Sequence, residues 1–171
     1  LFGDYNPSGR LPVSVPRHSG QLPVHYNHSK NKWTKYIDMS ALPLYEFGYG
    51  LSYTTFEYSN LQISPQHILA GGGTEISLDV KNTGKRFGNE VVQLYTSDVL
   101  SSVTTPVKEL RRFRKLGLEP GEKQTITFKL LPKDLALLDI NMNEVVEPGI
   151  FDILIGSSSE DIRLKGELEV K

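Results

Sequence analysis

The chain has 171 residues, of which 38% are hydrophobic and 23% charged, and its formal net charge is -1. This balance is typical of a soluble globular protein, and it argues against a nucleic-acid footprint or an acidic-membrane anchor because neither sign of charge dominates. The lack of cysteine excludes disulfides and thiolate metal sites, and no apolar run approaches the roughly 18 residues that a membrane-spanning helix needs.

Residues 1–43 do not resemble a self-sufficient domain. They contain few apolar residues, and so they would bury too little surface to offset the entropy of the chain. Residues 11–15 alternate apolar and polar side chains and predict one short strand, which the prolines confine to a sheet edge or end. Residues 22–26 predict a second extended piece of the same kind. We expect this segment to lean on the rest of the chain or on a partner.

Residues 44–58 are interpreted as a junction between the end of one domain and the start of a second. They hold six aromatic side chains in fifteen positions: Tyr45, Phe47, Tyr49, Tyr53, Phe56 and Tyr58. The glycines at 48 and 50 allow the backbone to take positive φ or to pass close to a neighbour. Such rings usually fill a domain interface, and we expect interdomain packing here. The alternative is a platform on which sugar rings stack.

From residue 56 onward, short runs alternate apolar and polar side chains. The pattern predicts strands at 56–64, 74–82, 90–97, 107–116 and 124–130, a helical turn from 132, and further strands in 135–138, 151–155 and 162–170. In 90–97, Val92 and Leu94 share one face while Val91 and Tyr95 share the other. The proline and glycine within 119–122 indicate a type II turn. Seven or eight short strands with turn signals every eight to twelve residues predict an all-β, two-sheet sandwich.

Three histidines, His18, His25 and His28, lie close together in the sequence. A metal site is not favoured, because the segment is extended and no acidic residue lies nearby. Asparagine 27 begins an Asn-His-Ser triplet that meets the N-glycosylation pattern, which also arises often by chance. Trp33 could stack on sugar, but an anchor that holds the N-terminal segment in place is the favoured interpretation.

The residues Asp139, Asn141 and Asn143 resemble the first half of a calcium-binding loop. Glu144 replaces the glycine that such a loop requires, and Ile150 stands where its final glutamate would be. A hairpin turn is therefore favoured. The basic run Lys108–Lys115 would alternate faces on a strand, which favours a solvated or interdomain strand over a nucleic-acid patch.

No residue pattern in the chain predicts catalysis. A retaining glycosidase needs two carboxyl groups about 5–5.5 Å apart, and an inverting one roughly 6.5–9.5 Å, but nothing in the sequence pairs two carboxylates. There is also no Ser-His-Asp signature, no phosphate loop and no metal constellation. By residue chemistry alone the chain is a scaffold with no catalytic or cofactor-binding residue.

Several motifs, in order, resemble glycoside hydrolase family three, which includes β-glucosidases and β-xylosidases. Residues 3–12 and 21–28 resemble the close of that family's α/β domain, and the run Pro-Leu-Tyr-Glu-Phe-Gly-Tyr-Gly-Leu-Ser-Tyr at 43–53 resembles the segment that joins it to the C-terminal module. The motifs at 80–85, 90–95, 106–110 and 146–149 resemble the family's fibronectin type III-like domain.

The resemblance implies that the chain has three parts. Residues 1–43 would be a remnant of the α/β catalytic domain with an extended linker, and residues 44–58 an aromatic junction. Residues 59–171 would be an immunoglobulin-like sandwich of the fibronectin type III-like type. It also implies a parent that is a retaining β-glycosidase, whose nucleophilic Asp and acid/base Glu lie upstream. No catalytic residue is therefore carried over to this chain.

The implied partners are the upstream catalytic domains of the same polypeptide and, through them, a β-linked oligosaccharide or glycoside. The implied location is periplasmic or secreted, and no cofactor is expected. Two other readings remain. A carbohydrate-binding module would need a row of exposed rings, for which only Trp33 and Tyr95 are candidates. A generic immunoglobulin-like adhesion domain fits the composition but not the junction motifs.

Overall fold

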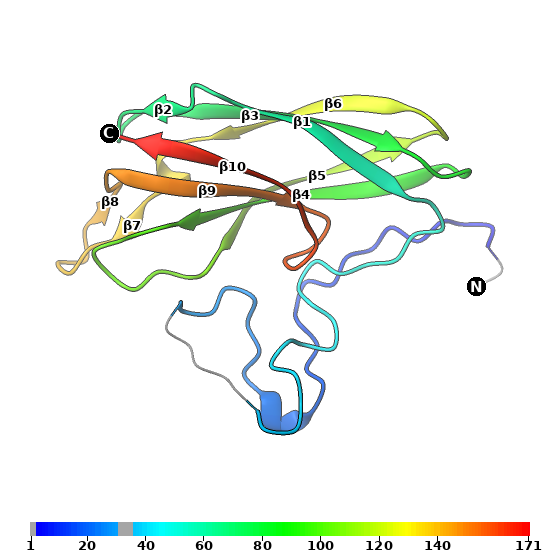
Figure 1. Cartoon of the computed structure of the whole chain (residues 1–171), viewed down its shortest axis with the longest axis horizontal. Coiled ribbons are helices and arrows are strands. Elements are labelled where there is room, and N and C mark those ends of the chain that lie inside the picture. Colours follow the sequence, from blue (N-terminus) through cyan, green and yellow to red (C-terminus); the bar gives the residue numbers. More distant parts are fainter. Residues whose placement is uncertain (1–2, 31–35) are drawn as a thin grey trace.

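Alternating apolar side chains build two β-sheets that face one another, and an irregular N-terminal segment lies against the outer face of one of them (Figure 1). The computed structural model describes residues 3–30 and 36–171. We call the described residues from 3 to 55 the arm, and the remainder the sandwich. The arm contains only a 3-10 turn, η1 (Ser19–Gln21), and isolated bridges. The part of the chain that the structure describes holds no helix long and apolar enough to cross a membrane.

The smaller sheet has three antiparallel strands in the order β1 (Phe56–Ser64), β3 (Thr74–Asn82) and β6 (Lys123–Leu130). The larger sheet has five strands in the order β2 (His67–Ile68), β10 (Ile162–Val170), β9 (Gly149–Gly156), β4 (Gly88–Asp98) and β5 (Glu109–Leu118). Only the β2–β10 pair is parallel. A hairpin of β7 (Leu137–Leu138) and β8 (Glu144–Val145) extends beside the sheets.

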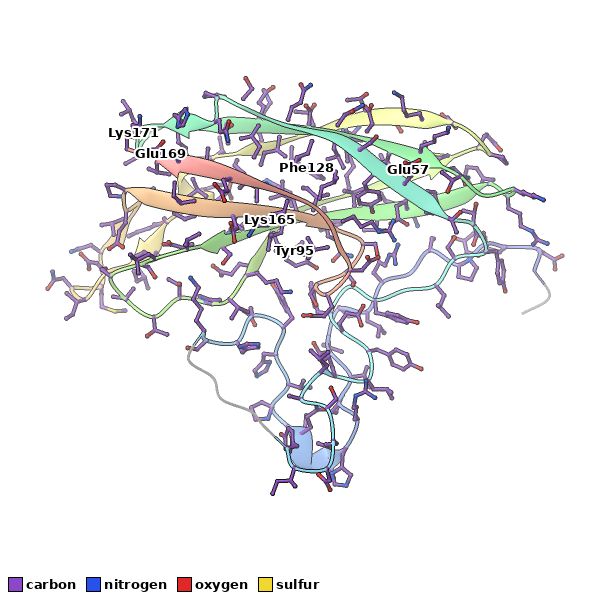
Figure 2. The ribbon with its side chains drawn as sticks, in the orientation of Figure 1. Glu57, Tyr95, Phe128, Lys165, Glu169 and Lys171 are labelled. Carbon is purple, nitrogen blue, oxygen red and sulfur yellow. The ribbon has the colours of Figure 1, made fainter. Side chains whose placement is uncertain are left out.

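The core lies between the two sheets because each strand turns one set of alternate side chains inward. On β3, for example, the side chains of Ile76, Leu78 and Val80 are fully buried, while their sequence neighbours Glu75 and Lys81 are exposed. Strands β4, β6, β9 and β10 contribute the same kind of apolar face, and Phe128 of β6 lies between the sheets (Figure 2). This continuous apolar layer is the main source of stability for the sandwich.

The strands expected from residue 56 onward are confirmed within about two residues. The first two match the observed β1 and β3, and the helical turn is the 3-10 turn η2 (Pro132–Asp134). The turn at 119–122 is also confirmed: Gly121 has φ of +80° and the Glu122 N–H donates to the Glu119 carbonyl at 3.0 Å. The strand expected within 135–138 is β7, and the structure adds the two-residue strands β2 and β8, which are too short to leave a periodic signal.

The two strands expected in the first 43 residues are wrong. Residues 11–15 make only a bridge, between Val15 and Tyr45, and residues 22–26 form no strand. Proline supplies no N–H, and prolines stand at 12, 16 and 23, so these pieces cannot sustain a ladder of hydrogen bonds. They are instead held by scattered contacts to the junction and to the sandwich.

Candidate functional site at the junction of arm and sandwich

The arm folds back on itself so that its first and last limbs run side by side. The Leu11 N–H donates to the Tyr49 carbonyl at 2.9 Å, and the Gly48 N–H donates to the Leu11 carbonyl at 2.8 Å. Further along, the Val15 N–H donates to the Tyr45 carbonyl at 2.7 Å. The limb around 11–15 is thereby tied to the aromatic junction, and both limbs are presented together to the large sheet (Figure 1).

Three aromatic rings connect the arm to β4. Phe47 stacks on Tyr26 with ring centroids 4.2 Å apart, and Tyr26 meets Tyr95 of β4 edge-on at 6.0 Å. The Tyr26 hydroxyl also accepts the Leu110 N–H at 3.2 Å. Tyr95 is fully buried on the arm side of the large sheet, opposite the core (Figure 2). Phe47 is thus one of the contacts that attach the arm to the sandwich.

The other rings of the junction have separate surroundings. Tyr45 and Tyr49 pack on each other with centroids 5.0 Å apart, and Tyr45 remains 41% exposed. Tyr53 is 51% exposed, with the guanidinium of Arg86 5.8 Å from its ring centre. Phe56 packs against the core at the start of β1. The rings therefore do not form one cluster, because the chain turns sharply at the glycines between them.

Gly48 and Gly50 lie where the backbone passes closest to its neighbours. Gly48 has φ of +81°, and a Cβ at that position would lie 2.3 Å from the Gln93 Oε1 atom. A Cβ on Gly50 would lie 2.3 Å from the Gly9 carbonyl oxygen. The expected need for positive φ or close approach is confirmed. Gly48 shows both, and Gly50 shows the close approach.

A buried ion pair links the arm to the sandwich. The Arg10 guanidinium donates to the Glu90 carboxylate at 2.8 Å, and the Tyr58 hydroxyl donates to the other oxygen of Glu90 at 2.7 Å. Only 2% of the Glu90 side chain and 15% of that of Arg10 are exposed. Burial, together with the charge of Glu90, raises the pKa of Tyr58 well above its usual value, so its hydroxyl stays a donor. The Arg163 guanidinium covers the Tyr58 ring at 4.7 Å.

A second buried polar residue, Gln93 of β4, connects three segments. Its amide nitrogen donates to the carbonyl of Gly48 at 3.3 Å and to that of Ser157, and its amide oxygen accepts the hydroxyl of Tyr95. Burial raises the pKa of Tyr95, which therefore remains protonated. The Gly48 carbonyl belongs to the arm, so this one bond of Gln93 forms only when the arm is in place.

The β9–β10 turn holds the arm from the other side. The Ser158 hydroxyl donates to the Glu46 carboxylate at 2.8 Å, and the Ser159 N–H donates to the Phe47 carbonyl at 2.9 Å. Asp161 accepts hydrogen bonds from Arg163 and from the Ser157 hydroxyl, and these lower its pKa although burial opposes the shift. The turn therefore presents an ordered polar surface to residues 46–48.

A cavity of about 310 Å³ opens between the arm, β1 and this turn. Three carboxylates line it: those of Glu46, Glu90 and Asp161. Each has a partner inside the protein, in Ser158, Arg10 and Arg163 respectively. These contacts tie the three carboxylates into the junction. Sequence reasoning missed Arg10, Glu90 and Gln93, because partners that are 45 to 80 residues apart leave no local signal.

The other candidate residues are dispersed. His18 accepts the Gly20 N–H at 3.0 Å and caps η1, and His28 bonds the neighbouring Ser29 carbonyl. Among residues 3–30 and 36–171, no three His, Asp or Glu side chains are grouped to hold a metal ion. Asn27 is exposed within the arm. Trp33 lies outside the described residues.

Asp139 is the acceptor of a hairpin turn, as favoured from the sequence. Its carboxylate accepts the N–H groups of Asn141 at 2.8 Å and Asn143 at 2.9 Å, between β7 and β8. The basic run Lys108–Lys115 lies mostly in the edge strand β5, where Arg112 pairs with Asp134. Basic side chains that are paired within the fold do not make a free patch for nucleic acid.

Two family models match separate parts of the chain. Residues 1–53 match the glycosyl hydrolase family 3 C-terminal domain, and residues 90–159 match a fibronectin type III-like domain. A putative beta-xylosidase of Formosa agariphila is 44% identical over 164 residues, which cover 95% of this chain and 22% of the relative. A periplasmic beta-glucosidase of Salmonella typhimurium is 43% identical, with 99% of this chain and 24% of the relative covered.

Solved structures agree with these matches. A beta-glucosidase from Erythrobacter marinus superposes with a TM-score of 0.94 at 40% identity, covering 99% of this chain and 22% of that one. A beta-glucosidase from Listeria innocua in complex with glucose superposes with a TM-score of 0.90 at 36% identity, covering 96% of this chain and 24% of that one. The chain therefore spans less than a quarter of the length of each of these four proteins.

Proposed function

We propose that the chain is the C-terminal region of a glycoside hydrolase family 3 enzyme, with its fibronectin type III-like domain, and that it is the non-catalytic support region of a retaining β-glycosidase. In this role the sandwich holds the end of the α/β catalytic domain in one orientation, while the catalytic carboxylates lie elsewhere in the polypeptide. A misplacement of about 1 Å at such a support can change a rate by on the order of 100-fold.

The proposal rests on the buried contacts between the arm and the sandwich. The arm coincides with the segment that matches the family's C-terminal domain. It is attached to β4 by the Arg10–Glu90 ion pair and by the edge-on contact of Tyr26 with Tyr95. A segment anchored in this way cannot rotate relative to the sandwich without separating Arg10 from Glu90, which would leave the Glu90 carboxylate buried without a cation.

The outward side of the arm is proposed to contact the upstream catalytic domains. It carries an apolar groove of about 580 Å³. The groove is lined by Leu11, Val15, Tyr45, Tyr49 and Leu51, together with Gly9, Arg10 and Gly50. Exposed apolar side chains gathered in one groove often mark an interface. The aromatic residues Tyr45, Phe47, Tyr49, Tyr53 and Phe56 are proposed to set the relative position of the two domains, with Phe47 on the sandwich side.

The proposed domain limits follow the sequence: residues 1–43 as the end of the α/β domain, 44–58 as the junction and 59–171 as the sandwich. The proposed substrates of the whole enzyme are β-linked glucosides or xylosides, supported by the names of the relatives. A periplasmic or secreted location is proposed on the same ground, since one relative is described as periplasmic.

The alternative of a carbohydrate-binding module is not favoured. One of its two candidate rings, Tyr95, is fully buried beneath the arm and cannot stack on sugar. Tyr45 and Tyr49 are tilted by 35° to one another and do not form a flat platform. Sugar stacking needs flat, accessible ring faces.

The proposal is tested by hydrolysis of nitrophenyl β-glucoside and nitrophenyl β-xyloside. We expect turnover by the full-length parent enzyme and none by the 171-residue chain at the same molar concentration. Hydrolysis by the purified chain would refute a purely supporting role, and the carboxylates around the junction cavity would then be the first to substitute.

A further inference from the structure

One end of the sandwich carries exposed apolar side chains that neither the core nor the arm uses. Two segments supply them: the loop between β4 and β5, and the β7–β8 hairpin, which lie at the left of Figure 1. We call this surface the end patch and define it as Val99, Leu100, Leu138, Ile140 and Met142. Their exposed fractions run from 52% for Val99 to 88% for Ile140. Single exposed apolar residues are ordinary, but five on two adjoining loops indicate an interaction surface.

Hydrogen bonds hold the two segments in place. The Val99 N–H donates to the Ile150 carbonyl at 3.0 Å, and the Ser102 N–H donates to the Glu147 carboxylate at 2.9 Å. The hairpin tip is closed by Asp139, as described above. The end patch is therefore presented on a defined framework, which lowers the entropy lost when a partner binds.

Acidic side chains surround the end patch. Burial raises the pKa of Asp98, and the neighbouring carboxylate of Glu147 adds to the rise. Hydrogen bonds from Ser102 lower the pKa of Glu147 against the repulsion of Asp139. The Glu147 carboxylate is thus close enough to those of Asp98 and Asp139 for their charges to repel. A second copy of this surface would add further repulsion, whereas an apolar surface edged by Lys or Arg would relieve it.

The arm already contacts one side of this surface with a basic residue. The Lys30 ammonium donates to the Val99 carbonyl at 3.3 Å and to the Asp98 carbonyl. Beside it, the Val107 N–H donates to the His28 carbonyl at 2.9 Å. Residues 28 and 30 belong to the segment that matches the family's C-terminal domain. The end patch therefore continues an interface that this segment already makes with the sandwich.

We propose that the end patch is a second docking surface for the remaining, catalytic part of the same polypeptide, contacted there by apolar side chains flanked by Lys or Arg. The inference rests on the proposed support function. About three-quarters of the length of the relatives lies outside the region matched here, so a large surface of the parent is available to cover it. Two separated contacts, at the arm and at the end patch, restrain rotation of the sandwich better than one.

Hydrogen exchange followed by mass spectrometry tests the docking. Peptides covering 99–103 and 137–145 are compared between the full-length parent and the 171-residue chain. We expect exchange in the parent to be slower by about tenfold or more, because docking adds to the free energy of local opening. Equal exchange in the two proteins would overturn the proposal.

Substitutions distinguish docking from a general effect of chain length. The double variant Leu100→Ser with Ile140→Ser should abolish the protection in the parent and leave exchange of the 171-residue chain unchanged. Leu69→Ser, at an exposed residue of the β2–β3 turn, is the matched control and should keep the protection. Protection that survives the double variant would overturn the proposal.

Two further measurements separate the alternatives. Sedimentation of the 171-residue chain over a range of concentrations would reveal a dimer, and a dimer lost in the double variant would overturn the proposal in favour of self-association. Hydrolysis of the nitrophenyl glycosides is assayed on the same parent preparation. An inactive but protected parent would refute the proposed enzymatic function alone, and an active but unprotected parent would refute the docking alone.

Discussion

Arg10 and Glu90 are 80 residues apart in the chain and form an ion pair of 2.8 Å at the junction of arm and sandwich. The Arg10 guanidinium comes from the arm, and the Glu90 carboxylate comes from β4 of the large sheet. Because the pair is buried, each charge depends on the other to offset the loss of water. The attachment of the arm is therefore part of what stabilises the sandwich.

Replacing Arg10 should destabilise the chain strongly. We expect Arg10→Ala to lower the free energy of unfolding by about 3–5 kcal/mol, because it leaves the Glu90 carboxylate buried without a cation. Urea denaturation measures the change. Lys129→Ala is the control, since its ion pair with Glu75 is exposed and should contribute little. Equal effects of the two variants would contradict the assignment of a buried, stabilising pair.

The stack of Phe47 on Tyr26 should contribute measurably to the attachment of the arm. Phe47→Ala is expected to lower the free energy of unfolding by about 1–2 kcal/mol, from lost stacking and lost burial of a half-buried ring. In the full-length parent, Phe47→Ala and Tyr49→Ala should lower stability or turnover. Tyr5→Ala, at a ring that is 67% exposed, serves as the control. Unchanged melting temperature and turnover in both junction variants would argue against a positioning role.

Gly48 should not tolerate any side chain. Gly48→Ala is expected to cost about 1–2 kcal/mol for the left-handed backbone alone, and the clash with Gln93 adds to this. Gly71→Ala is the matched control, because a Cβ there has no neighbour within 4 Å. Thermal unfolding of both variants measures the difference. A Gly48→Ala variant as stable as its control would show that the turn at Gly48 is not required.

Asp79 of β3 should make stability depend on pH in acid. Hydrogen bonds from Thr125, Asn60 and Lys123 lower its pKa from the usual 3.8 to about 2. Because the pKa is lowered in the folded state, the stabilisation is fully present above about pH 4 and is lost as pH falls towards 2. Urea midpoints measured between pH 5 and pH 2 should fall less steeply in Asp79→Asn than in the wild-type chain. Parallel curves would contradict this linkage.

Local pattern was sufficient for the strands of the sandwich and for its turns. The alternation of Ile76, Leu78 and Val80 predicts β3 because successive side chains of a strand point to opposite faces. The sequence also correctly placed Tyr95 and Val91 on one face of β4, and Val92 and Leu94 on the other. The site was harder to predict: Phe47 and Gly48 were singled out, whereas nothing marked Glu90 and Gln93 within a strand that was expected to carry apolar side chains on both faces.

By itself, therefore, the sequence determined the class of fold and the order of the longer strands along the chain, since these depend on periodicity, on the permissive backbone of glycine and on the restricted backbone of proline. Only the tertiary structure decided which polar residues are buried and what they bind. Arg10 finds Glu90, and Gln93 finds the Gly48 carbonyl, because the arm folds back across β4. Pairings over such separations arise from packing of the whole chain, and no local pattern encodes them.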